Sequence, residues 1–191
     1  RVTASRFEAP KTPNYTNNAA DVFLKNFTTW CGAGDQGLDR KWLKKQFTLL
    51  KKNSLISDVF INTDRQLIVL THDLPVFDYY DKKTDYRVGR IAIKINPGGN
   101  ETITVKNLDW WCDNRYHNLY GSEHPHANND RVFCFGDSGN IYTQCRRDGN
   151  LYGLVEMMLN LLVNFDLQDG DYMKWFEYRR SRDASQCNDF I

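Results

Sequence analysis

The side chains best suited to covalent chemistry lie close together in the second half of this sequence. His124 and His126 flank Pro125, and Cys134 follows after seven further residues. A cysteine attacks as the thiolate, which a nearby imidazole or backbone dipole favours. The proline fixes a turn, so a donor on that turn would face an oxyanion forming beside the sulfur. The pattern predicts acyl-transfer chemistry at Cys134; the alternative, from residue types alone, is a buried and inert cysteine.

The same stretch also contains the residue types of a zinc site. Thiolates and imidazoles are ligands that zinc prefers. The candidates are Cys112, His117, His124, His126 and Cys134. The closely spaced ligand pairs of common zinc motifs are missing, and a His-x-His pair alone is weak evidence. A zinc-binding domain is therefore one alternative.

A third interpretation makes Ser138 the nucleophile. Residues 134–139, Cys-Phe-Gly-Asp-Ser-Gly, resemble the nucleophile segment of chymotrypsin-like proteases. However, Asn140 replaces that family's second glycine, and His72 lacks its usual Ala-Ala-His-Cys context. A long helix is predicted soon after Ser138, where a double barrel needs strands. The protease is a lesser alternative.

Hydrophobic periodicity predicts the elements that would position these residues. Helical spacing predicts helices over residues 21–30, 39–52, 150–165 and 172–181. Alternation with a period of two predicts strands around residues 59–61, 91–95 and 103–105, and a short apolar run predicts one over residues 66–70. The short turns between them indicate a four-stranded antiparallel meander. Residues 110–135 show no periodicity, which is more typical of a functional segment than of an idle one. This order of elements indicates an α+β fold.

The composition limits the class of protein. The chain has 191 residues, 41% of them hydrophobic, which suffices for one domain with its own core. Lys and Arg total 25 against 24 Asp and Glu, and this balance argues against a dedicated nucleic-acid binder. No apolar run approaches the length of a membrane span. Five irregularly spaced cysteines do not form a disulfide framework, so a reducing, cytoplasmic location is expected.

The order of the elements and one spacing resemble the ubiquitin-conjugating (UBC) fold family. Its members have an N-terminal helix, a four-stranded meander, a His-Pro-Asn turn, seven residues, the catalytic cysteine and a long crossover helix. This sequence matches at residues 124–126, at the seven-residue spacing to Cys134, and at Tyr142, where many relatives have an aromatic residue. Residues 86–89, Tyr-Arg-Val-Gly, resemble the family's Tyr-x-Gly-Gly strand entry.

The resemblance also divides the chain and shows two departures. It covers roughly residues 38–180, so a UBC-like domain is expected over residues 38–191 and an N-terminal extension over residues 1–37. His126 replaces the family's Asn, and Arg131 replaces a common Gly three residues before the cysteine. A His-Pro-His turn is reminiscent of divergent bacterial and phage-borne members.

The resemblance implies a role for each candidate residue. Cys134 would accept the C-terminus of a ubiquitin-like protein as a thioester. His126 would stabilise the tetrahedral oxyanion, whereas His124 would shape the turn. Asp169, in the acidic loop at residues 166–171, would orient the incoming lysine; alternatively, that loop is only a solvated helix terminus. No metal or organic cofactor is implied.

The resemblance further implies protein partners. They are a ubiquitin-like protein and its activating enzyme; the charge balance and the lack of a long apolar run already predict no nucleic-acid or membrane partner. The family's first helix is a docking surface, which here corresponds to a basic helix with the cations Arg40, Lys41, Lys44, Lys45, Lys51 and Lys52. The simpler interpretation of these cations is a solvated face. A UBC-like scaffold that binds partners without forming a thioester is the main alternative function.

Overall fold

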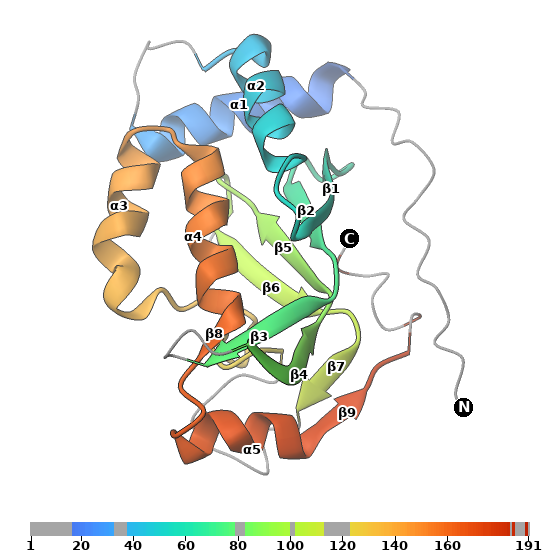
Figure 1. Ribbon diagram of the computed structural model, residues 1–191. Coiled ribbons are helices and arrows are strands. Elements are labelled where there is room, and N and C mark those ends of the chain that lie inside the picture. Colours follow the sequence, from blue (N-terminus) through green and yellow to red (C-terminus); the bar gives the residue numbers. More distant parts are fainter. Residues whose placement is uncertain are drawn as a thin grey trace.

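The predicted α+β fold is confirmed (Figure 1). Among the residues that the structure describes, two helices precede a run of strands along the sequence and further helices follow it. The computed structural model describes residues 17–32, 38–78, 83–99, 102–112 and 123–183, together with residues 185 and 190. The zinc candidate His117 lies outside these ranges, as do residues 1–16 and 33–37 of the predicted N-terminal extension. No helix in the described ranges is both long enough and apolar enough to cross a membrane.

The central sheet is the predicted antiparallel meander. Its strands are β1 (Ile56–Ile61), β2 (Leu67–Thr71), β5 (Ile91–Ile95) and β6 (Ile103–Asn107), in the spatial order β1-β2-β5-β6. In register, Val69 faces Ile93, and Ile93 faces Val105 on the next strand. These three side chains are completely buried, which is why one face of the sheet carries β-branched residues at every second position.

A hairpin that periodicity did not predict is inserted between β2 and β5. Its strands are β3 (Leu74–Asp78) and β4 (Lys83–Gly89), and they form a separate sheet with the short β8 (Asn164–Phe165). Pro75 lies within β3, and a proline is a reason to reject a strand unless it lies at an edge or an irregularity. The register of β3 and β4 indeed shifts on both sides of Pro75.

Five helices are seen in the described part of the chain, and they correct the predicted boundaries. Three match the prediction in place: α1 (Asn17–Cys31), α2 (Arg40–Leu50) and α4 (Leu151–Val163). The helix α3 (Gly139–Arg147) was not predicted. The last helix, α5 (Gly170–Tyr178), ends earlier than residue 181, because residues 179–181 form the strand β9 (Arg179–Ser181).

The strand β9 pairs with the short strand β7 (Trp110–Cys112), so its partner lies far away in the sequence. The Arg179 guanidinium lies 4.4 Å from the centroid of the Trp110 ring, a cation–π contact that local periodicity does not reveal. This tertiary pairing explains why the predicted helix stops at Tyr178.

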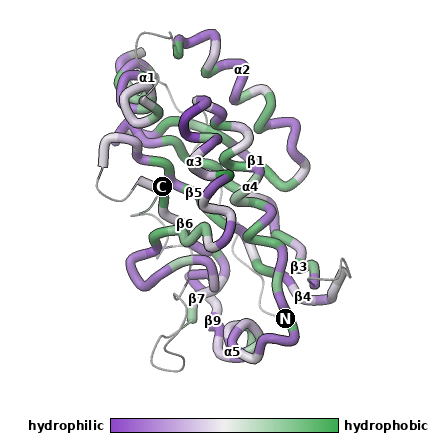
Figure 2. Tube along the Cα trace, turned by 90° about the vertical axis from the view of Figure 1, so that its left-hand side faces the viewer, coloured by the Kyte–Doolittle hydropathy of each residue, from purple (hydrophilic) through white to green (hydrophobic). Residues whose placement is uncertain are grey.

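The main core lies between the four-stranded sheet and the helix α4. Leu154, Met158 and Leu162 are all at most 1% exposed along one face of α4. Burying each such side chain contributes about 1.5–3 kcal/mol to folding. The helix α1 belongs to the same core, since Phe23 and Phe27 are buried in it. On α2, hydrophobic and hydrophilic residues alternate along the trace, which shows its amphipathic character (Figure 2).

Candidate active site

The seven residues between His126 and Cys134 form a closed loop whose two ends meet. The Cys134 amide donates a hydrogen bond to the His126 carbonyl oxygen at 2.8 Å. Within the loop, the Asn128 side-chain oxygen accepts from the Asp130 amide at 3.0 Å and from the Val132 amide at 2.8 Å. The predicted spacing therefore has a structural meaning, because it returns Cys134 to the turn that carries the histidines.

The loop is attached to the edge of the central sheet. The Phe133 amide donates to the Ile103 carbonyl at 3.1 Å, and the Val105 amide donates to the Arg131 carbonyl at 2.9 Å. Arg131 has a φ of 67°, a left-handed backbone that is uncommon for residues other than glycine. This left-handed residue lies three positions before Cys134.

His124 is completely buried and uses both ring nitrogens within the protein. Its Nδ1 accepts from the His126 amide at 3.0 Å, so the ring hydrogen resides on Nε2, which donates to the Leu162 carbonyl at 3.0 Å. Burial, and secondarily the neighbouring His126, hold the pKa of His124 well below 6.5. A neutral ring with both nitrogens occupied shapes the turn and leaves no group for a substrate.

His126 lies partly open to solvent beside the loop. Its ring contacts Phe133 and Tyr172, each with ring centroids 6.2 Å away. Burial lowers its pKa, and a hydrogen bond with the Cys134 backbone opposes that shift. A neutral imidazole therefore lies beside the residue that carries the thiol. The hydrogen bond with the Cys134 backbone engages its one N–H, which would have to turn to an oxyanion forming beside the sulfur in order to stabilise it.

Cys134 is an exposed free thiol at the start of a new helical segment. After Phe135 the chain forms the short 3₁₀-helix η2 (Gly136–Ser138) and then α3. The Phe135 ring stacks on Tyr142 with centroids 4.2 Å apart, and Tyr142 in turn contacts Trp30 on α1 at 6.2 Å. Aromatic packing therefore anchors the chain on the C-terminal side of the cysteine, as the sheet anchors it on the other.

Asp169 caps the helix α5. Its side chain accepts from the Asp171 amide at 2.8 Å, which satisfies a backbone donor that the helix leaves unpaired. One turn later, Tyr172 contacts the His126 ring, so the beginning of α5 lies next to the turn. The predicted acidic loop is thus close to the other candidate residues, and Asp169 already has a structural task there.

The described residues give no support to the zinc interpretation or to the protease interpretation. In the described ranges, no three His, Cys, Asp or Glu side chains are grouped so that they could hold a metal ion. The ring nitrogens of His124 are both used in hydrogen bonds. Ser138 ends η2 and is followed by α3 rather than by a strand. Among the described contacts, none joins Ser138 to a histidine.

One residue beside the site escaped prediction. Glu123, which precedes the turn, is 1% exposed and contacts Arg131 and Arg182. The sequence carries no signal for it, since an isolated Glu is ordinarily on the surface.

Comparison of the chain with protein-family models, with curated proteins and with solved structures found no match.

Proposed function

We propose that this protein is a conjugating enzyme that carries the C-terminus of a ubiquitin-like protein as a thioester on Cys134. The observation that carries the proposal is the loop closed between His126 and Cys134. It joins an exposed thiol, a neutral imidazole and a turn with the spacing typical of the UBC family. The left-handed backbone at Arg131, where that family has a glycine, supports the same assignment.

The proposed reaction is an exchange of thioesters followed by aminolysis. The Cys134 thiolate attacks the carrier's C-terminal carbonyl in its thioester with the activating enzyme, and that enzyme's thiolate leaves. An acceptor amine then attacks the new thioester; the Cys134 thiolate departs, and the amine loses a proton. In both steps a tetrahedral oxyanion forms beside Cys134, where the His126 N–H would stabilise it.

The activating enzyme would dock on the basic face of α2. The helix carries four cations between Arg40 and Leu50 and no acidic residue. Lys41, Lys44 and Lys45 are exposed, and no carboxylate of the described residues lies within ion-pair distance of them. A groove of about 360 Å³ opens beside these cations between α1, α2 and β1, with Leu43 and Phe47 in its lining. A complementary acidic surface would be attracted to this face and would associate faster at low salt.

The experiment incubates the protein with candidate ubiquitin-like proteins and their activating enzymes. We expect an adduct that reducing agent removes, and that is absent in Cys134→Ala but present in Cys145→Ala. Cys145 is a matched control because it is a partly exposed free thiol on the neighbouring helix α3. If a carrier charged by its own activating enzyme forms no adduct, the protein is a non-catalytic scaffold.

A further inference from the structure

A buried carboxylate connects the Cys134 loop to the C-terminal part of the chain. The Glu123 side chain is 2% exposed and that of Arg182, which it contacts at 2.9 Å, is 8% exposed. The same carboxylate accepts from Arg131 Nε at 3.1 Å and from the Asn107 amide at 3.0 Å. A carboxylate is buried at tolerable cost only where it is paired and hydrogen-bonded in this way. Glu123 therefore joins three segments that are distant in the sequence.

Arg131 is the point where this connection reaches the loop. Its backbone accepts from the Val105 amide, and its side chain bonds to Glu123. Its guanidinium also lies 5.9 Å from the centroid of the Phe190 ring, so a second part of the C-terminal segment contacts it. A residue other than glycine keeps a left-handed backbone only where its surroundings hold it there. Both sets of contacts supply that restraint at Arg131.

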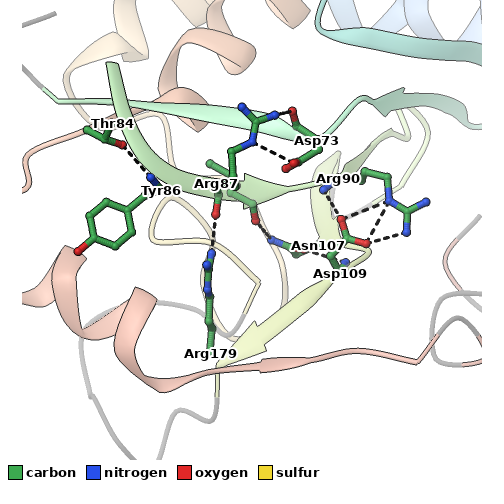
Figure 3. A network of polar contacts seen from close by, with 9 residues as sticks. Asp73, Thr84, Tyr86, Arg87, Arg90, Asn107, Asp109 and Arg179 are labelled. Atoms are coloured by element: carbon green, nitrogen blue, oxygen red, sulfur yellow. Dashed lines mark hydrogen bonds and ion pairs between the residues drawn. The ribbon is translucent and has the colours of Figure 1, made fainter. Parts of the chain in front are cut away.

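The other end of the connection is firmly anchored. The Arg182 amide donates to the Asp109 carbonyl at 2.8 Å, directly after the β7–β9 pairing. Asp109 is itself held by Arg90, whose Nη2 lies 2.6 Å from the carboxylate. Figure 3 shows this pair and, on β9, Arg179 donating to the Arg87 carbonyl. These contacts hold β9 in place, so Arg182 presents its guanidinium to Glu123 from a fixed position.

We propose that Arg131 is a positioning residue for Cys134, and that the C-terminal segment holds it in place through Glu123. The reaction at Cys134 that Arg131 would serve rests on the proposed function. The coupling of the C-terminal segment to the Cys134 loop through Glu123 does not. Releasing Arg182 from Glu123 would leave Glu123 without one of its anchors, weaken its hold on Arg131 and so loosen the loop that returns Cys134 to His126. A partner that displaces β9 would thereby lower the activity of a thiol that it does not touch.

The first test measures amide hydrogen exchange of the full chain by mass spectrometry in Arg182→Ala, with Arg180→Ala as its matched control. Both variants remove one arginine from the same segment, but Arg180 is exposed on β9. We expect exchange in residues 127–134 to be at least about tenfold faster in Arg182→Ala only, with α4 unchanged. Unchanged exchange in that loop would overturn the proposal. Equal acceleration in α4 would also overturn it, because it would report global destabilisation.

A second variant leaves the Glu123–Arg182 pair intact. Arg131→Asn removes the guanidinium, while Asn tolerates a left-handed backbone better than most residues. We expect faster amide hydrogen exchange at residues 131–134 even if the variant melts at the same temperature as the wild type. Wild-type exchange in this variant would contradict a positioning role.

The functional measurement is the single-turnover rate of thioester formation at Cys134. The rate constant should fall at least about tenfold in both variants, a loss typical of misplaced reacting groups, with the half-saturating carrier concentration unchanged. A changed half-saturating concentration at an unchanged rate would overturn the assignment. If the wild type forms no adduct but exchange responds as expected, the proposed function fails and the coupling stands. If an adduct forms but exchange does not respond, the coupling fails and the proposed function stands.

Discussion

His124 should make the stability of this protein fall as the pH is lowered from about 7.5 to 5.5. Its ring is fully buried, and the hydrogen bonds to the His126 amide and the Leu162 carbonyl require the neutral form. Burial is the main reason that its pKa in the folded protein lies well below 6.5. The folded state therefore resists protonation over a range in which the unfolded chain takes up a proton.

The magnitude follows from this difference in bound protons. An unfolded histidine titrates near pH 6.5, and each proton bound only by the unfolded state costs the folded state about 1.4 kcal/mol per pH unit. The contribution of His124 is therefore fully present well above pH 6.5 and is lost as the pH falls through and below 6.5, until the folded pKa is reached. Between pH 7.5 and 5.5, His124 alone should lower the free energy of unfolding by up to about 1.4 kcal/mol, of which about 1 kcal/mol is lost between pH 6.5 and 5.5.

Urea unfolding at pH 7.5, 6.5 and 5.5 measures this loss, with His124→Gln as the comparison. A glutamine has an amide donor and a carbonyl acceptor but no proton to titrate in this range. The variant should be less stable than the wild type at pH 7.5 and should lose less stability on acidification. Titrating groups that do not contact His124 are common to both proteins and cancel in the difference. If both proteins lost the same free energy, His124 would not be neutral and buried, and the reasoning would be refuted.

Three further substitutions test other parts of the structure. Asp169→Ala should cost about 1 kcal/mol of stability through loss of the α5 cap, whereas Asp169→Ser should keep the cap. If the Asp169 carboxylate orients the acceptor amine, both variants should slow transfer of the carrier to lysine without slowing thioester formation. Gly89 has a φ of 95°, and an added Cβ would lie 2.7 Å from the Trp110 side chain. Gly89→Ala should therefore lower the melting temperature more than Gly149→Ala, where the nearest atom to an added Cβ is 3.4 Å away. Equal losses of melting temperature would contradict the close contact at Gly89. Lys44→Glu should slow charging by the activating enzyme, most at low salt, and a salt-independent effect would argue against electrostatic docking on α2.

The sequence predicted the parts of the fold that depend on regular spacing. The strands of the central sheet and the helix α4 line one main core, and the residues that face it repeat with the period of each element. The strands β2 and β6 are buried on both faces, and the second face carries a smaller cluster that includes Ile68, Leu70 and Ala92. The proximity of the histidine turn and Cys134 was also predicted from their spacing. It depends on a local loop closed by its own backbone and by Asn128, and such local geometry is encoded within a few residues.

Local signals failed where a distant partner decides the structure. The strand β9 was predicted as helix because its pairing with β7 cannot be read from residues 179–181. The helix α3 has no fully buried residue, so its sequence lacks a strong apolar stripe. The hairpin of β3 and β4 was obscured by Pro75.

The tertiary structure alone decided how the candidate site is held and charged. The Nε2–H of His124 donates to the Leu162 carbonyl, 38 residues away in the sequence, and burial among distant segments keeps the ring neutral. Glu123 is buried and ionised because Arg131 and Arg182 meet it, and Arg182 is 59 residues away. Neither fact can be read from the residue types, since a pKa and a hydrogen-bond partner depend on what surrounds a group in space. The sequence by itself thus determined which residues could react and their spacing, whereas the packing of distant segments determined their protonation and their support.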